Sequence, residues 1–212
     1  MKTYQVKGLL QKNDWLLNPF VTIDSKGKIT KISAIGTYDE YIDGYVLPGF
    51  QNAHSHAFQY VMSGLTEVHG YQSRKHDFWT WRYAMYQVAL SVNPEQLESI
   101  ATMLYVEMLR NGYTSVAEFH YLHHDEKGHH YTNLSELGER LISAAKKAGI
   151  RITLIPIFYQ KGGFGLSAEV HQRRFLSEDV DDYFCLLEAS DDSIKLYENA
   201  QMGYGIHSLR AA

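Results

Sequence analysis

After about residue 44, segments typical of strands alternate with segments typical of helices. Apolar runs rich in β-forming residues recur near 45–54, 113–120, 152–159 and 202–208. Helical patterns separate the later runs, at about 94–111, 134–148 and 177–189. This alternation predicts a parallel sheet, either a (β/α)8 barrel or a doubly wound sheet. The doubly wound alternative has no glycine-rich nucleotide-binding motif to support it.

The clearest helix is predicted from Pro94 to Asn111. Asn93 is a favoured N-cap, Pro94 suits the first helical position, and Gly112 marks the end. Apolar residues recur at spacings of three and four, which predicts one buried stripe: Leu97, Ile100, Ala101, Leu104 and Met108. The two apolar runs at 113–120 and 152–159 are typical of buried strands in a parallel sheet.

The N-terminal part is predicted to be a small β domain covering residues 1–46, followed by the barrel part at 47–212. Phe20–Ile23 and Ile29–Ile32 flank the turn Asp24–Gly27, which is a hairpin signal.

Polar residues gather where the predicted strands end. In a barrel, functional side chains collect at the carboxyl ends of the strands. Six residues of this sequence fall there: His54, His56, Glu118, His120, Tyr159 and His207. The alternative for any one of them is that it only satisfies backbone groups at a strand end. The pairs His123-His124 and His129-His130 are more typical of solvated loops.

His54 and His56 stand two apart directly after a strand-forming run. In an extended strand these positions share a face, so both imidazoles can aim at one point, as a bound cation requires. The alternative is a pair of polar residues on a loop, because the H-x-H pattern alone is weak.

Charge and cysteine content narrow the class of protein. The formal charge of -4 provides no basic field, so a nucleic-acid partner is not expected. The single Cys185 cannot form an internal disulfide, and the N-terminus lacks the apolar stretch of a secretory signal. No run reaches the roughly 18 apolar residues of a membrane span. We therefore expect a cytoplasmic protein without membrane partners.

Several motifs together resemble one family. They are PGFQNAHSHAFQ at 48–59, GLTEV at 64–68, FWTWR at 78–82, MLRNGYTSVAEFHYLHHD at 108–125, QRRFL at 172–176 and HSLRA at 207–211. In these motifs the chain resembles the formimidoylglutamate deiminases of the amidohydrolase superfamily, from Leu47 to the last residue. The resemblance implies a zinc-dependent (β/α)8 barrel with a small β domain. It also implies hydrolysis of N-formimidoyl-L-glutamate to N-formyl-L-glutamate and ammonia in histidine degradation.

The resemblance also assigns roles. It implies that His54 and His56 bind one zinc ion, and that two arginines hold the two substrate carboxylates. Arg82 and Arg210 match those arginines, since planar guanidinium groups bind carboxylates with paired hydrogen bonds. The positions that match substrate contacts are Gln59, Tyr121 and His207. The alternatives are an aromatic core patch with Arg82 on a solvated rim, and a plain loop at Tyr121.

Two histidines do not complete a catalytic zinc site, which generally has three protein ligands. The remaining ligand and the catalytic acid and base are expected beyond Ala212, because a complete barrel needs about 250 residues. We expect the first half of a barrel that is inactive alone, from a parent that acts on a small molecule as a homodimer. The alternatives are another amidohydrolase deaminase, or a non-catalytic fragment that binds ligand or oligomerises.

Overall fold

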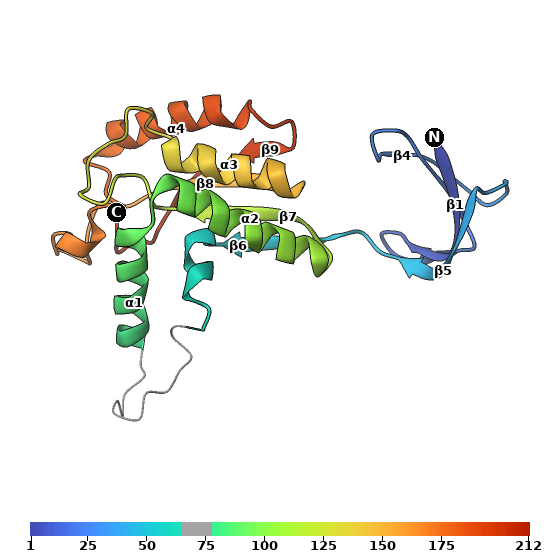
Figure 1. Ribbon diagram of the computed structural model, residues 1–212, viewed down its shortest axis with the longest axis horizontal. Helices are drawn as coiled ribbons and strands as arrows, with labels where there is room; N and C mark the ends of the chain where they lie inside the picture. The colour runs from blue at the N-terminus through green and yellow to red at the C-terminus, as the bar shows by residue number, and fades with distance from the viewer. Residues whose placement is uncertain (65–77) are drawn as a thin grey trace. The chain divides into compact units, whose positions relative to one another are not determined.

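The structure is a computed structural model that describes residues 1–64 and 78–212 (Figure 1). The chain divides into two compact units, Met1–Gly49 and Phe50–Ala212.

The first unit is a five-stranded sheet built around β1, Lys2–Leu10. Antiparallel neighbours are β2, Trp15–Leu17, and β3, Phe20–Ile23, while β5, Glu40–Val46, pairs with β1 in parallel. β4, Ile29–Ser33, pairs antiparallel with β3, which confirms the predicted hairpin. In its turn, the Asp24 carboxylate accepts hydrogen bonds from the backbone of Lys26 and Lys28. A small core of Val6, Leu9 and Val21 lies beneath the sheet.

The second unit contains the predicted parallel sheet. Its strands are β6, Phe50–Ser55; β7, Tyr113–His120; β8, Arg151–Phe158; β9, Ala200–Met202; and β10, Gly205–Ile206. The order is β10-β8-β7-β6, with β9 also paired to β8, and every pairing is parallel.

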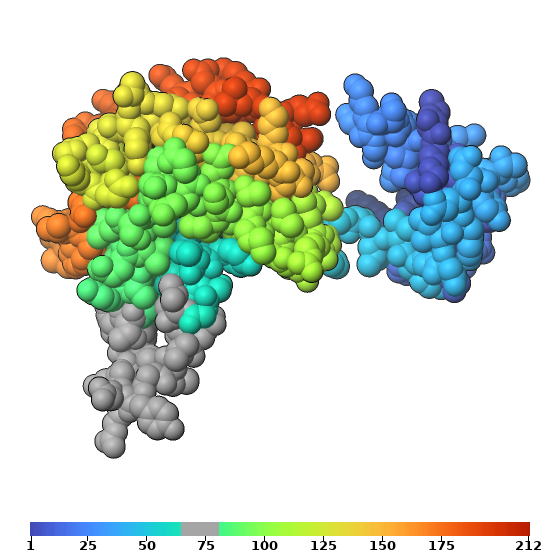
Figure 2. Space-filling model, viewed as in Figure 1, coloured from blue at the N-terminus to red at the C-terminus, as the bar shows by residue number. Residues whose placement is uncertain are grey.

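Helices pack on this sheet side by side. They are α2, Pro94–Arg110; α3, Glu136–Ala148; and α4, Val180–Ile194 (Figure 1). In the space-filling view they form one continuous packed layer (Figure 2). Helix α1, Phe78–Ser91, packs against the short 3-10 helices η1, Ala57–Met62, and η2, Val170–Gln172. None of the helices in the described ranges is long and apolar enough to cross a membrane.

Local signals explain the best-predicted elements. The Asn93 side chain accepts from the Gln96 backbone, and the Gln96 side chain accepts from the Asn93 backbone, which forms a capping box at the start of α2. Gly112 and Gly149 follow α2 and α3 at φ 86° and 87°, a left-handed conformation that glycine adopts without strain. These helix ends were predicted within two residues.

Three predicted elements differ from the structure. The run at 45–54 is not one strand, because β5 ends at Val46 and β6 begins at Phe50 in the other unit, on either side of Pro48, which lacks a backbone donor. The last run, 202–208, is interrupted between β9 and β10. Helix α4 starts at Val180 rather than 177, because the Asp179 carboxylate caps it by accepting from the Asp182 backbone.

A partly buried ion-pair network centred on Glu98 joins helices α2 and α3. Its carboxylate pairs with Arg140 at 3.1 Å and Lys147 at 2.5 Å, and accepts from the Ser143 hydroxyl at 2.7 Å. Desolvation acts to raise the Glu98 pKa, but these partners outweigh it and lower the pKa to about 2. The charged form of Glu98 therefore stabilises the contact between the two helices.

We predict that Glu98→Gln lowers the free energy of unfolding by roughly 1–2 kcal/mol at pH 7, because it removes hydrogen bonds to charged partners. The folded pKa of Glu98 is depressed, so its contribution is complete above about pH 4.5 and is lost as the pH falls towards 2. Urea unfolding across this range should show the wild-type and variant curves converging at low pH. Glu95→Gln is the matched control, since the Glu95 side chain is 70% exposed in its pair with Arg140. A constant difference at all pH values would contradict the role of Glu98.

Candidate active site

His54 and His56 lie at the carboxyl end of β6. Their Nε2 atoms are 3.0 Å apart and their ring planes are nearly perpendicular, at 84°. Two imidazole nitrogens that bind one tetrahedral zinc ion at 2.0–2.1 Å stand about 3.3 Å apart. The two rings therefore converge as ligands of one cation would.

β7 fixes the orientation of this pair. His56 Nδ1 lies 2.8 Å from the backbone oxygen of Phe119, and the His54 ring packs on the Phe119 ring at 4.3 Å. A carbonyl oxygen only accepts, so His56 carries its proton on Nδ1 and presents a lone pair on Nε2. Desolvation, and then the neighbouring His54, lower the pKa of His56, which favours the neutral form that a metal needs.

Glu118 binds the segment on either side of His56. It is buried, and its carboxyl accepts from the Ala57 backbone at 2.6 Å and from the Tyr105 hydroxyl at 3.1 Å. Ser55 supplies a further side-chain hydrogen bond. Desolvation outweighs these donors and raises the Glu118 pKa to about 7. Glu118 therefore ties β7 to the residues on both sides of His56, through the Ser55 side chain and the Ala57 backbone.

His54 and His56 have no third potential metal ligand beside them in the described part of the chain. Within residues 1–64 and 78–212, no three His, Cys, Asp or Glu side chains converge to hold a metal ion. The third ligand, expected beyond Ala212, stays a prediction.

A cavity of about 260 Å³ opens beside His56. The structure brings the five predicted substrate-binding residues together around it: Gln59, Arg82, Tyr121, His207 and Arg210. His56 also lines the cavity, whereas His54 does not. These five residues come from η1, α1 and the segments that follow β7 and β10, and the fold brings them together. Their individual roles stay predictions.

Hydrogen bonds and charge set the polarity of this cavity. Gln59 Nε2 donates to the Tyr121 hydroxyl at 2.7 Å, and the Tyr121 ring packs against His56 at 4.9 Å. The pKa of His207 falls to about 4, first through desolvation and then through repulsion from Arg210, His56 and Arg82. His207 is therefore neutral at physiological pH, and the two arginines carry the positive charge of the cavity.

Sequence analysis missed several lining residues. Tyr86 lies one turn after Arg82 on α1, and its hydroxyl accepts from Arg82 Nε at 2.9 Å. Phe175, from the QRRFL segment, also lines the cavity and is almost fully buried against the ring of Tyr121. Gln172 of the same segment donates to the hydroxyls of Tyr86 and Tyr159 and does not itself line the cavity. The i,i+4 spacing of Arg82 and Tyr86 would have placed Tyr86 beside Arg82 on a helix, but no helix was predicted there. The side chains of residues 78–80 in FWTWR, and residues 65–68 of GLTEV, lie outside the described part.

The histidine pair at 123–124 was expected in a solvated loop, and this is wrong. His123 and His124 are 3% and 6% exposed. Their Nε2 atoms lie 3.0 Å from the Ile157 oxygen and 2.6 Å from the Leu176 oxygen, respectively. These bonds join the loop after β7 to strand β8 and to the segment after η2.

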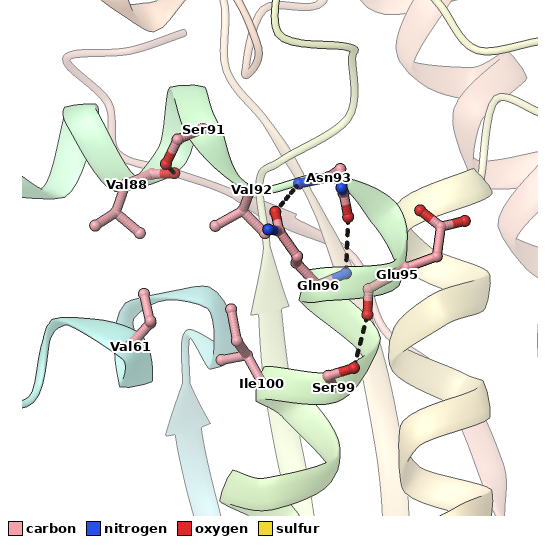
Figure 3. A pocket seen from close by; sticks show the side chains of 9 residues that line it. All are labelled: Val61, Val88, Ser91, Val92, Asn93, Glu95, Gln96, Ser99 and Ile100. Carbon is pink, nitrogen blue, oxygen red and sulfur yellow. Dashed lines mark hydrogen bonds between the residues drawn. The ribbon is translucent and has the colours of Figure 1, made fainter.

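A larger cavity, of about 630 Å³, lies elsewhere in this unit, between η1, α1 and the start of α2 (Figure 3). Valine and isoleucine side chains line much of it. Its polar groups are used in helix caps and turns: Asn93 and Gln96 bond each other's backbones, and Ser99 donates to the Glu95 oxygen (Figure 3). This cavity therefore offers little chemistry, and the smaller one beside His56 is the candidate active site.

Comparison with known proteins agrees with this geometry. Residues 45–205 match the amidohydrolase family. The chain belongs to the amidohydrolase family. Its parallel sheet with covering helices is accordingly part of a TIM-barrel type of fold, as predicted.

Two relatives share over two fifths of their aligned residues with this amidohydrolase. It is 43% identical over 200 residues to the formimidoylglutamate deiminase of Pseudomonas aeruginosa. The alignment covers 93% of this chain and 43% of that protein. The crystal structure of an amidohydrolase from Brucella melitensis matches all of this chain and 47% of its own, with 42% identity and a TM-score of 0.91. The predicted resemblance to the deiminases is confirmed.

A more distant neighbour shows the fold alone. An adenosine deaminase from Xanthomonas campestris, solved with bound zinc, covers 96% of this chain at 16% identity and a TM-score of 0.66, and 42% of its own chain is matched. The chain spans less than half the length of these two amidohydrolase-family relatives, from Pseudomonas aeruginosa and Brucella melitensis.

We predict that Glu118→Leu destabilises the protein by roughly 2–3 kcal/mol, because the Ala57 amide and Tyr105 hydroxyl lose their acceptor. Glu118→Gln keeps an acceptor oxygen and is the matched control. The folded pKa of Glu118 is raised, so its stabilising effect is complete below about pH 4.5 and is lost as the pH rises through about 7. Chelator-treated wild type should therefore lose stability relative to Glu118→Gln over this range. Parallel curves for the two proteins would contradict the raised pKa.

Proposed function

We propose that this chain contributes the metal-histidine pair and the carboxylate-binding cavity of a zinc-dependent deiminase for N-formimidoyl-L-glutamate. The reaction consumes one water molecule, breaks the amidine C–N bond, and gives N-formyl-L-glutamate and ammonia. The observation that carries the proposal is the meeting of His56 with Arg82 and Arg210 around one cavity. The relative from Pseudomonas aeruginosa, named for this activity, supports it.

The histidine pair fits a zinc ion. Nε2 of His56 has its lone pair available because Nδ1 donates to Phe119, and the separation from His54 Nε2 suits a shared tetrahedral cation. A zinc ion held there would supply Lewis-acid activation of water near neutral pH. We infer that further ligands and the proton-transfer groups belong to the part of the relatives' length that this chain does not span.

The cavity residues fit a small dianion. Arg82 and Arg210 provide two guanidinium groups, and each can bind a carboxylate with two hydrogen bonds. Arg82 is oriented by its Nε hydrogen bond to Tyr86. Binding the two carboxylates would fix the amidine end of the substrate beside His56. A nucleobase substrate, by contrast, has no carboxylates to match the two arginines.

The residues of this chain would thus act mainly by positioning. Neutral His207 and the Gln59–Tyr121 pair line the same cavity as His56 and the arginines, so they can hydrogen-bond the substrate without a competing charge. Holding the reacting carbon in one orientation is itself a large part of rate acceleration. The expected homodimer and cytoplasmic location stay predictions.

We predict that His56→Ala loses bound zinc and activity together, whereas Arg82→Ala keeps its zinc and raises KM by roughly 10- to 100-fold through loss of a charged hydrogen-bond donor. The measurements are metal content after dialysis and ammonia release from N-formimidoyl-L-glutamate by the longest natural form of the protein. His129→Ala is the control, because the His129 side chain is 74% exposed outside the site. Loss of zinc from Arg82→Ala, or no turnover by the wild type, would contradict the assignment.

A further inference from the structure

Gln172 has its carboxamide fixed in one orientation. It is fully buried, at 0% exposure, and comes from the 3-10 helix η2. Its Oε1 accepts from the Glu169 backbone N–H at 2.7 Å. A backbone N–H can only donate, so the oxygen must face Glu169 and the NH2 group must face the opposite way.

That NH2 group meets two phenols. Gln172 Nε2 donates to the Tyr159 hydroxyl at 2.6 Å and to the Tyr86 hydroxyl at 3.3 Å. Tyr86 also accepts from Arg82 Nε. Both phenol oxygens therefore act as acceptors behind the cavity wall. Each phenol still has one proton of its own, and an N–H donor cannot receive it.

Both phenols line the candidate active site, where the charge is positive. Tyr159 and Tyr86 border the same cavity as Arg82 and Arg210, and they are 3% and 5% exposed. The fields of both guanidinium groups act on Tyr159. Tyr159 nevertheless stays neutral, because desolvation raises its pKa to about 12. Its hydroxyl is thus a neutral donor in a cavity that two cations line.

We infer that Tyr159 donates its phenolic hydrogen bond to a substrate carboxylate held by the arginines, and that Gln172 is a positioning residue that imposes this direction on the bond. This inference rests on the proposed function, since it names a further contact in the same cavity. It makes the Tyr159 hydroxyl a determinant of specificity for a carboxylate. An amide in place of the substrate carboxylate would turn N–H groups towards the arginines, whose guanidinium groups have donors only.

The test is binding of glutarate, a simple dicarboxylate, measured by titration calorimetry. Tyr159→Phe should weaken binding by about tenfold, which corresponds to one hydrogen bond to a charged group. Tyr204→Phe is the matched control, because Tyr204 is 73% exposed and does not line the cavity. Unchanged glutarate affinity in Tyr159→Phe, or no binding by the wild type, would overturn the inference.

Gln172→Glu separates the positioning role from a structural one. The substituted carboxylate keeps an oxygen for the Glu169 N–H, so the fold should be retained, but it would capture the phenolic protons and repel the dianion. Glutarate affinity should therefore fall by more than tenfold with little change in melting temperature. Wild-type affinity in this variant would overturn the role of Gln172. A variant that unfolds is replaced by Gln172→Met, which releases the phenols, and unchanged affinity there has the same meaning.

Kinetics distinguish this inference from the proposed function. In a protein that hydrolyses N-formimidoyl-L-glutamate, Tyr159→Phe should raise KM about tenfold with little change in kcat. Turnover with an unchanged KM in Tyr159→Phe would overturn the inference and leave the proposed function intact. Glutarate binding that depends on Tyr159, without turnover by the longest natural form, would support the inference and overturn the proposed function.

Discussion

The parallel pairing of β6 with β7 is the constraint on which the candidate site depends. The register sets Ser55 opposite Glu118. In this register the Glu118 carboxyl reaches the Ala57 amide, and the next residue along β7, Phe119, offers its backbone oxygen to His56. A shift by one residue would turn Glu118 to the other face of the sheet and leave both bonds unmade. The convergence of the two imidazoles is thus a property of strand pairing.

A network of buried polar groups around Arg174 holds segments that contribute residues to the cavity. Arg174 is fully buried, and its guanidinium donates to the backbone oxygens of His124, Ala89 and Val92. The backbone oxygen of Arg174 in turn accepts from the amides of His123 and His124. Buried polar groups are costly unless they are bonded, so this network specifies one arrangement of the loop after β7 and the segment around η2.

Side-chain hydrogen bonds also fix the orientation of residues around the cavity. Gln59, Arg82 and Gln172 each use one polar atom to bind a tyrosine hydroxyl, in Tyr121, Tyr86 and Tyr159, respectively. The side chains around the cavity are therefore oriented before a ligand arrives, which lowers the entropic cost of binding.

The sequence by itself determined the elements that rest on local signals. The N-cap of α2, the glycines that end α2 and α3, the apolar runs of β7 and β8, and the H-x-H pair at a strand end were all readable, because caps, periodicity and strand alternation act over a few residues. The resemblance to the family's motifs identified two further candidate residues, Arg82 and Arg210.

Only the tertiary structure decided the rest. The bonds that join Gln172 to Tyr86 and Tyr159 depend on groups that folding brings together. Gln172 and Tyr86 are separated by 86 residues, and no period or spacing links them. A buried amide takes its direction from the partners that folding places around it, so its role appears only once the loops are packed.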